Sequence, residues 1–508
     1  MQRASQTATG EALNALAARF SAGNDSIAQL VRKDQDLAAE AGKLDKAIIA
    51  AVSAEPSRRD VTKEQRIRGR IAAIAKERDD LQAIFTRDFP EYAALSKPQP
   101  LTVKEIQALL ADDEAIAIVE LGPKDAKTYV WAITRSVADW KETAVTADQV
   151  SETVSRLRAS LNADSREPFD TKLSFELYRE VFGPIENTIG PKARWSLVLN
   201  GALTSLPPQV LVTSDPAGQA LKDVDWLIRA HALTVLPSLS SLKVLRSKAA
   251  AAEAKNPLIG FADPVFDREL PRLQQNSLVM AELAVARGGR GAVADIALLR
   301  KALPALPETA NELKQVAASV KASDADVILG PDATETRVKR SKLDQYRIVY
   351  FATHGLLAGE VSQFAKLNAE PALVLSLPAK PTELDDGLLT ASEVAQLKLS
   401  ADWVVLSACN TAAGDKPGAE ALSGLARAFF YAGGRSLLVS HWEVETNSAV
   451  ALMTGTFAAL AANPKLSHGE ALRQSMLAMI NHPQQPNLVE PKYWAPFVVV
   501  GEPAKPTP

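Results

Sequence analysis

The sequence predicts an α/β fold, with a parallel or mixed sheet flanked by helices and a helical hairpin in front of it. From about residue 101 onward, short apolar runs rich in β-branched residues alternate with helical patterns. This order is typical of strand–helix–strand units. Residues 10–89 instead repeat apolar residues at helical spacing. With 508 residues, 47% of them hydrophobic, the chain is long enough for two or three globular domains.

Residues 1–97 are predicted to form an N-terminal arm of two helices. A break at residues 53–60, which contains Pro56, separates two amphipathic stripes. Two such helices pack most simply as an antiparallel hairpin. No 34-residue period is present, so we do not predict helical repeats. The hairpin could dock an activating protein partner or serve only as a structural support. The second stripe comprises Ile67, Ile71, Ile74, Leu81, Ile84 and Phe85.

Residues 98–265 are predicted to form an α/β half without catalytic residues. The prolines at positions 98 and 100 mark a linker, after which strand patterns begin. No cluster of acid, base and nucleophile occurs in this half, so we interpret it as a scaffold. We expect a hairpin over residues 115–134, helices over 147–161 and 175–185, and strands over 195–199, 232–236 and 257–262.

Residues 266–508 are predicted to form a second α/β half. A helix after Pro307, a strand at 327–329 and a helix at 334–343 lead into a strand at 347–353. Such a unit builds a parallel sheet through a right-handed crossover. Further strands are expected at 372–376, 403–408 and 435–440, and further helices at 390–397 and 421–431.

Two of these strands end in residues that can do chemistry. His354 follows one buried strand, and Cys409, the only cysteine of the chain, follows another. The carboxyl ends of parallel strands meet at one edge of a sheet, so we expect the imidazole and the thiol to share that edge. The two residues are 55 positions apart (409 minus 354), which leaves room for a crossover and an insertion.

This pair predicts a cysteine-nucleophile hydrolase, most simply a protease. A free thiol has a pKa of about 8.5, so a neighbouring imidazole is needed to take its proton at neutral pH. The backbone N–H groups of Gly355 and Cys409 could stabilise an oxyanion. His441 is a rival base, because it also follows a predicted strand. Purely structural roles for the cysteine and the histidine remain open, since both residue types often fill cores.

Two strings around these residues resemble the signature of CHAT domains, caspase-like peptidases related to separase. They are Phe-Ala-Thr-His-Gly at residues 351–355 and Leu-Ser-Ala-Cys-Asn-Thr at 406–411. The resemblance implies a caspase-like sheet flanked by helices, with 98–265 as a pseudo-caspase half and 266–508 as the active half. It also implies His354 as base, Cys409 as nucleophile, and no metal or organic cofactor. Further similar stretches lie at residues 177–184, 206–207, 424–433, 440–444 and 494–501.

The resemblance also indicates where the substrate is read. In the caspase clan, the strand after the nucleophile and its following loop form the pocket for the residue before the cut. Carboxylates there would pair with a guanidinium or ammonium group, so we predict cleavage after Arg or Lys. Ordinary surface acids are the simpler reading, and Arg427 and Arg435 could instead serve an acidic substrate. The candidate pocket residues are Trp442, Glu443, Glu445, Asp415 and Glu420.

A lone cysteine after a buried strand also suggests two functions other than proteolysis. A cysteine phosphatase needs an Arg shortly after the nucleophile, and none occurs between Cys409 and Arg427. A caspase-like scaffold that no longer cuts is the stronger alternative. A latent protease, whose loop at residues 412–420 is ordered by a partner, would also fit.

Composition and charge exclude several classes. A net charge of −3 gives no basic field for nucleic acid. A single cysteine excludes an intramolecular disulfide and a thiolate-rich zinc site. No apolar run reaches the length of a membrane-spanning helix, and no signal peptide is visible. We therefore expect a cytoplasmic protein with a protein or peptide substrate, if the chain is complete; it could also be a piece of a longer one.

Overall fold

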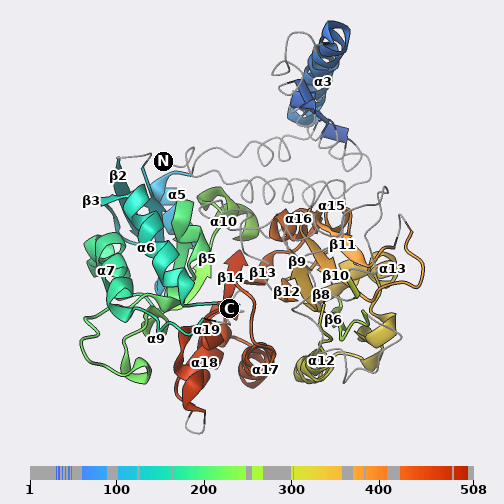
Figure 1. Ribbon diagram of the computed structural model, residues 1–508. Coiled ribbons are helices and arrows are strands. Elements are labelled where there is room, and N and C mark those ends of the chain that lie inside the picture. Colours follow the sequence, from blue (N-terminus) through green and yellow to red (C-terminus); the bar gives the residue numbers. More distant parts are fainter. Residues whose placement is uncertain are drawn as a thin grey trace. The chain divides into compact units, whose positions relative to one another are not determined.

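The structure is a computed structural model, and its described residues fall into two compact units (Figure 1). One unit contains Leu101–Arg246 and Ala252–Pro508, and the other contains Leu13–Pro100. The described residues are 60–88, 101–122, 126–162, 165–246, 254–266, 299–300, 303–356, 370–382, 385–408, 424–482 and 485–501, with single positions between 30 and 48.

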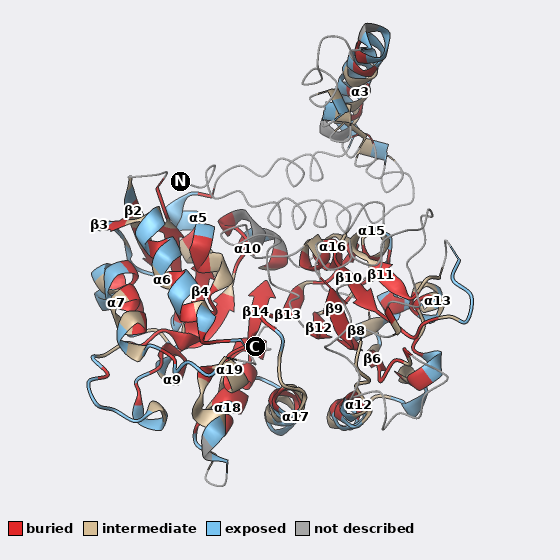
Figure 2. Cartoon of the chain, in the orientation of Figure 1, coloured by how far each residue is buried: buried red, intermediate tan, exposed pale blue. Residues whose placement is uncertain are grey.

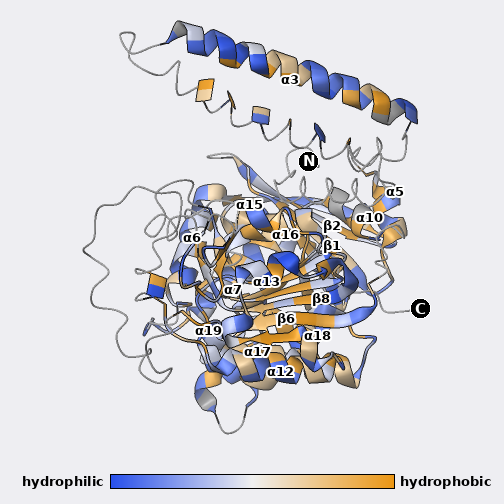
Figure 3. Cartoon of the chain, turned by 90° about the vertical axis from the view of Figure 1, so that its right-hand side faces the viewer, coloured by the Kyte–Doolittle hydropathy of each residue, from blue (hydrophilic) through white to orange (hydrophobic). Residues whose placement is uncertain are grey.

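The smaller unit contains the predicted antiparallel helical hairpin. Helix α3 (Val61–Asp88) faces a segment whose described positions between 30 and 48 are also helical. Arg70 binds Glu40 at 2.7 Å, and Arg78 binds Asp34 at 2.9 Å. From Arg70 to Arg78 the residue number rises along α3, whereas that of the partner falls from Glu40 to Asp34. The two segments therefore run antiparallel, which confirms the prediction. The hairpin buries Ile67, Ile74 and Leu81 of the α3 stripe and Leu37 of the facing segment, while α3 is otherwise largely hydrophilic (Figure 3).

The larger unit is built on one mixed sheet of eleven strands among the described residues. Its order is β3-β2-β1-β4-β5-β14-β13-β12-β8-β6-β7. Neighbours are parallel except in the pairs β1–β2, β2–β3 and β13–β14. The strands are β1 (Glu114–Glu120), β2 (Lys127–Thr134), β3 (Ala138–Thr146), β4 (Arg194–Val198), β5 (Ala232–Val235), β6 (Asn256–Ala262), β7 (Val327–Leu329), β8 (Tyr346–Ala352), β12 (Trp403–Ser407), β13 (Ser436–Ser440) and β14 (Phe497–Gly501).

Helices cover both faces of this sheet, so its central strands are buried throughout (Figure 2). One face carries α5 (Val103–Leu109), α10 (Leu239–Arg246), α15 (Ala391–Val394) and α16 (Gly424–Ala432). The other carries α6 (Ala147–Ala159), α7 (Thr171–Val181), α12 (Glu308–Ser319), α17 (Thr446–Ala462) and α18 (His468–Ile480). The shorter helices are α8 (Glu186–Ile189), α9 (Leu227–Ala230), α13 (Glu335–Arg340) and α19 (Pro491–Trp494).

Local sequence signals explain where several helices begin and end. Thr102 and Thr146 each form a capping box with the residue three positions later. The helix expected from residue 175 begins at Thr171, because the Asp170 side chain accepts a hydrogen bond from the Leu173 N–H. Gly433 has a φ of 126°, a conformation that favours glycine, and lies directly after α16.

A second, three-stranded antiparallel sheet lies beside the ends of β8 and β12. It consists of β9 (His354–Leu356), β10 (Ala372–Val374) and β11 (Leu388–Thr390), in the order β11-β10-β9. The strand expected at 372–376 is β10, but β9 was not predicted. His354 is therefore the first residue of a new strand and not only the exit of β8.

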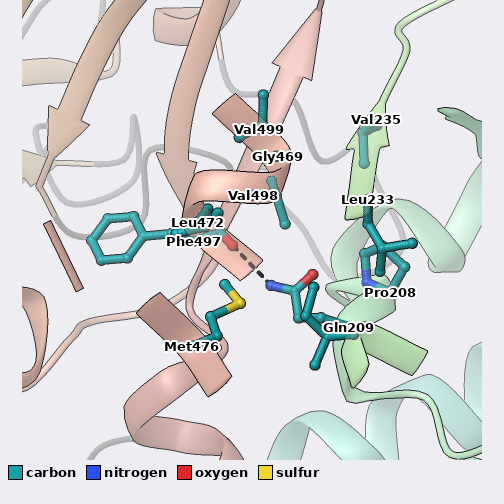
Figure 4. A pocket seen from close by; sticks show the side chains of 11 residues that line it. Pro208, Gln209, Leu233, Val235, Gly469, Leu472, Met476, Phe497, Val498 and Val499 are labelled. Atoms are coloured by element: carbon teal, nitrogen blue, oxygen red, sulfur yellow. Dashed lines mark hydrogen bonds between the residues drawn. The ribbon is translucent and has the colours of Figure 1, made fainter. Parts of the chain in front are cut away.

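The two halves of the larger unit share the main sheet. β14, near the end of the chain, pairs with β13 on one side and β5 on the other. The Gln209 side-chain amide donates to the Phe497 carbonyl at 2.8 Å (Figure 4). It also donates to the Ala495 carbonyl at 2.9 Å. The cavity drawn there measures about 10 Å³, room for no more than one water molecule. β6, expected in the first half, lies beside β8; the division at residues 97/98 and 265/266 stays a prediction.

Candidate functional site

The strands that lead to His354 and Cys409 are neighbours. β8 and β12 pair in parallel, with Ala352 opposite Ser407 at the end of the ladder. His354 lies two residues beyond Ala352, and Cys409 lies two positions beyond Ser407 in the sequence. The two strands thus run to the same edge of the sheet, as expected. Cys409 itself lies outside the described residues, so its pairing with His354 stays a prediction.

Packing on both sides holds this edge in place. Every residue of β12 is buried. Beyond it, the Thr353 N–H donates to the Ser407 carbonyl at 3.3 Å. On the other side, the Ser440 hydroxyl at the end of β13 donates to the Ala408 carbonyl at 2.6 Å. The residue before Cys409 is therefore tied to the neighbouring strand.

His354 is held in a form that can accept a proton. Its ring Nε2 lies 2.8 Å from the Pro304 carbonyl. A carbonyl only accepts hydrogen bonds, so Nε2 carries the hydrogen and Nδ1 has the free lone pair of the neutral ring. The Phe266 ring lies 5.3 Å away. Burial lowers the pKa of His354, although the Pro304 hydrogen bond opposes this. The imidazole is accordingly neutral at pH 7.

Pro304 is a functional group that sequence reasoning missed. The sequence around Pro304 indicates only that a helix begins after Pro307. The contribution of Pro304 is its backbone carbonyl, which any residue type could supply, so no side-chain pattern points to it. Only the packing of this segment against β9 reveals the contact.

Gly355, the proposed oxyanion donor beside Cys409, lies inside β9. It is buried and pairs with Leu373 of β10. Its φ is not positive, so this glycine is not needed for a left-handed backbone. Its role at an oxyanion site stays a prediction.

His441, the rival base, follows β13 and is 4% exposed. Its backbone N–H donates to the Pro496 carbonyl at 2.9 Å, and its backbone carbonyl accepts from the Arg158 guanidinium of α6 at 3.1 Å. Its ring Nδ1 has no hydrogen-bond partner among the described residues. Burial, together with the nearby Arg158 charge, lowers the pKa of His441 to about 3. This ring is neutral as well, so charge state does not separate the two candidates.

The residues predicted to form the substrate pocket have diverse surroundings. Trp442 is 2% exposed, and its indole N–H donates to the Lys492 carbonyl at 3.1 Å. Its ring belongs to the main hydrophobic core. Glu443, the next residue, is exposed. Asp415 and Glu420 lie outside the described residues. The pocket as a whole stays a prediction.

Glu445 has a clear structural role. Its carboxylate caps α17, accepting from the N–H groups of Asn447 and Ser448 at 3.1 and 2.8 Å and from the Ser448 hydroxyl at 2.8 Å. Burial would raise the pKa of Glu445, but the hydrogen bonds from Ser448 and Asn447 outweigh it and lower the pKa. The side chain is thus ionised at neutral pH and engaged with the helix that follows the candidate pocket.

Arg435, considered for an acidic substrate, lies at the opposite end of β13 from His441. Its guanidinium donates to the Leu245 carbonyl at 2.8 Å and reaches Asp402 at 3.4 Å.

Within the described ranges, no group of three or more His, Cys, Asp or Glu side chains could hold a metal ion. No described helix is long and apolar enough to cross a membrane.

Comparisons with known proteins place the chain in a family. The family model for the CHAT domain matches residues 171–502, well over half of the chain. Tetratricopeptide repeat protein 28 of Mus musculus is 31% identical over 206 residues, which are 35% of this chain and 8% of that protein. The chain therefore spans less than a tenth of this relative's length.

Two solved structures have a similar but distant arrangement. The Saccharomyces cerevisiae separase–securin complex matches with a TM-score of 0.45 and 10% identity, over 92% of this chain and 37% of that chain. The Arg-specific cysteine proteinase gingipain R matches with a TM-score of 0.36 and 10% identity, over 70% of this chain and 74% of that chain. The family match alone confirms the resemblance seen in the sequence: the chain belongs to the CHAT domain family.

Proposed function

We propose that this chain is a cysteine endopeptidase in which His354 is the general base and Cys409 the nucleophile. The observation that carries the proposal is the pairing of β8 with β12, with Ala352 opposite Ser407. Each proposed catalytic residue follows its paired residue by two positions. The Pro304 hydrogen bond, which leaves Nδ1 free to accept a proton, supports the same assignment.

The chemistry follows from these groups. Nδ1 of His354 takes the thiol proton, and the thiolate attacks the carbonyl carbon of the peptide bond. The N–H groups of Gly355 and Cys409 would stabilise the resulting oxyanion. The intermediate collapses to a thioester while the imidazolium gives its proton to the leaving amine. Water, activated by the same imidazole, then hydrolyses the thioester and restores the thiol.

We further propose cleavage after Arg or Lys. Glu443 is exposed directly beyond β13, the strand beside β12. A carboxylate there would pair with a basic side chain, with the loop acids Asp415 and Glu420 adding negative charge. Glu445 is ionised but serves as a helix cap, so we expect it to contribute little to the pocket.

The helical arm at residues 1–97 is proposed to dock a protein partner. Much of α3 is exposed (Figure 2). Its sequence is rich in charged residues, which suits a reversible contact. Binding there could order the loop at residues 412–420 and switch on a latent protease. The alternative is a scaffold that binds partners without cutting them.

The test uses the full chain with peptides ending in Arg, Lys or Asp before the cut. A thiol-reactive peptide ending in Arg should label Cys409, the only cysteine, and turnover of the Arg peptide should disappear in Cys409→Ala and His354→Ala. His441→Ala is the matched control and should keep most of the turnover. Faster cleavage after Asp would overturn the specificity. If the folded chain neither labels nor turns over peptide, also with residues 1–95 removed, the scaffold is favoured.

A further inference from the structure

A carboxyl group is fully buried beneath β8 and β12. It belongs to Glu312 of α12, which is 0% exposed. The hydroxyl of Tyr350, a fully buried residue of β8, donates to Glu312 Oε1 at 2.5 Å. The hydroxyl of Ser407, the last residue of β12, also faces this carboxyl and influences its pKa. Glu312 is thus hydrogen-bonded to β8 and lies close to the end of β12.

Burial of the Glu312 carboxyl in this core is unfavourable for the stability of the fold. Phe457 of α17 lies 6.0 Å from the Tyr350 ring and 5.2 Å from the Trp403 ring, measured between centroids. The second oxygen of Glu312 has no hydrogen-bond partner within the described residues. Burying a polar group with incomplete hydrogen bonding costs stability, and an apolar side chain of similar size would avoid that cost. Stability alone therefore does not account for a Glu at this position.

The two contacts lie directly before the proposed catalytic residues. Tyr350 precedes His354 by four residues, and Ser407 precedes Cys409 by two. The same stretch of chain that carries Glu312 also supplies the Pro304 carbonyl bound to His354. Because a packed core transmits small shifts, a change in the spacing of the two strands would move the residues that follow them.

We infer that Glu312 is a positioning residue: bound by the Tyr350 hydroxyl on β8 and lying beside Ser407 at the end of β12, it sets the spacing of the two strands and thereby the approach of His354 to Cys409. This inference rests on the proposed function of that pair. In this role Glu312 takes no proton from the substrate and acts only through the two strands.

The structure supplies a matched control on the same strand. The hydroxyl of Tyr346, at the start of β8, donates to the Asp326 carboxylate, also at 2.5 Å. This contact has the same chemistry as the one at Tyr350. Asp326, however, is joined to β7 and reaches only the amino end of β8, far along the strand from His354. Tyr346→Phe should therefore leave the catalytic edge unchanged.

The experiment compares four variants of the full chain: Glu312→Leu, Glu312→Gln, Tyr350→Phe and Tyr346→Phe. Misplacement by about 1 Å can reduce catalysis roughly a hundredfold. We expect Glu312→Leu and Tyr350→Phe to lower kcat for an Arg peptide about tenfold or more, with KM little changed. Glu312→Gln should stay within about threefold of the original kcat, because the amide oxygen can still accept the Tyr350 hydrogen bond and the side chain keeps its size.

A second readout does not depend on turnover. The alkylation rate of Cys409, the single thiol, should change in Tyr350→Phe and not in Tyr346→Phe, with thermal unfolding confirming that each variant folds. Equal effects of the two Tyr substitutions, or full kcat in a folded Glu312→Leu variant, would overturn the inference. Failure of the proposed function would be recognised differently. In that case the alkylation rate of Cys409 would be the same in the original chain and in the His354→Ala variant.

Discussion

Replacing Glu312 by Gln should remove a pH-dependent contribution to stability. Burial raises the pKa of Glu312 from 4.5 to about 7, while hydrogen bonds from Tyr350 and Ser407 oppose the rise. The folded chain therefore keeps this proton up to about pH 7, whereas the unfolded chain releases it near pH 4.5. Between these values the folded state binds more protons, so the contribution is complete below pH 4.5 and is lost as pH rises through 7.

The magnitude follows from the width of this window. A shift of about 2.5 pKa units at about 1.4 kcal/mol each gives roughly 3 kcal/mol. Because Glu312 is 0% exposed, solvent screening does not reduce this figure. Gln cannot ionise, so the stability of Glu312→Gln relative to the original chain should rise by about 3 kcal/mol between pH 4.5 and pH 8.

The assay is urea unfolding of both chains at several pH values. Other titrating groups, including the buried histidines, contribute equally to both proteins and cancel in the difference. The difference should be flat below pH 4.5, rise through neutral pH and level off above pH 8. A difference that does not vary with pH would refute the reasoning, since Glu312 would then titrate alike in the folded and unfolded states.

Three further predictions address neighbouring groups. Glu445→Ala should cost about 1 kcal/mol of stability by thermal unfolding, as the loss of a helix cap does, and leave KM for an Arg peptide nearly unchanged; a large rise in KM would instead make Glu445 a pocket residue. Burial lowers the pKa of His468 to about 3, so its contribution is present above pH 6.5 and lost as pH falls toward 3, on the order of 5 kcal/mol. His468→Phe should reduce the acid sensitivity measured by urea unfolding, and an unchanged profile would contradict the burial argument. His441→Ala should keep most of the peptide turnover that His354→Ala abolishes; equal losses would transfer the role of base to His441.

The sequence predicted those parts of the fold that depend on local patterns. The apolar runs of β8 and β12 are strands, and both end where polar residues begin. The helical hairpin was predicted from its apolar stripes. The ion pairs between α3 and the facing segment are consistent with an antiparallel arrangement. β3 was missed because most of its residues are exposed and several are charged, which resembles a loop. β9 was missed because only one residue separates it from β8, so the two look like one strand. β11 was missed because its three residues run directly into α15.

Features that depend on distant contacts could not be predicted. β14 inserts between β13 and β5, a pairing that no local pattern indicates. The Pro304 carbonyl has no side-chain signature. Glu312 looks like an ordinary charged residue of an amphipathic helix until its burial is seen. The sheet edge that His354 and Cys409 were expected to share could be predicted from the order of strands and helices. The Pro304 carbonyl and the buried Glu312 carboxyl could not, because their contacts depend on how distant segments pack.

The central claim is tested most directly by a crystal structure of the full chain with an Arg-ended peptide aldehyde bound. The account predicts a covalent bond from Cys409 Sγ to the aldehyde carbon. It also predicts His354 Nδ1 within about 4 Å of that sulfur, with Nε2 still bound to the Pro304 carbonyl. An unmodified Cys409, or a sulfur on the far side of the sheet from His354, would contradict it.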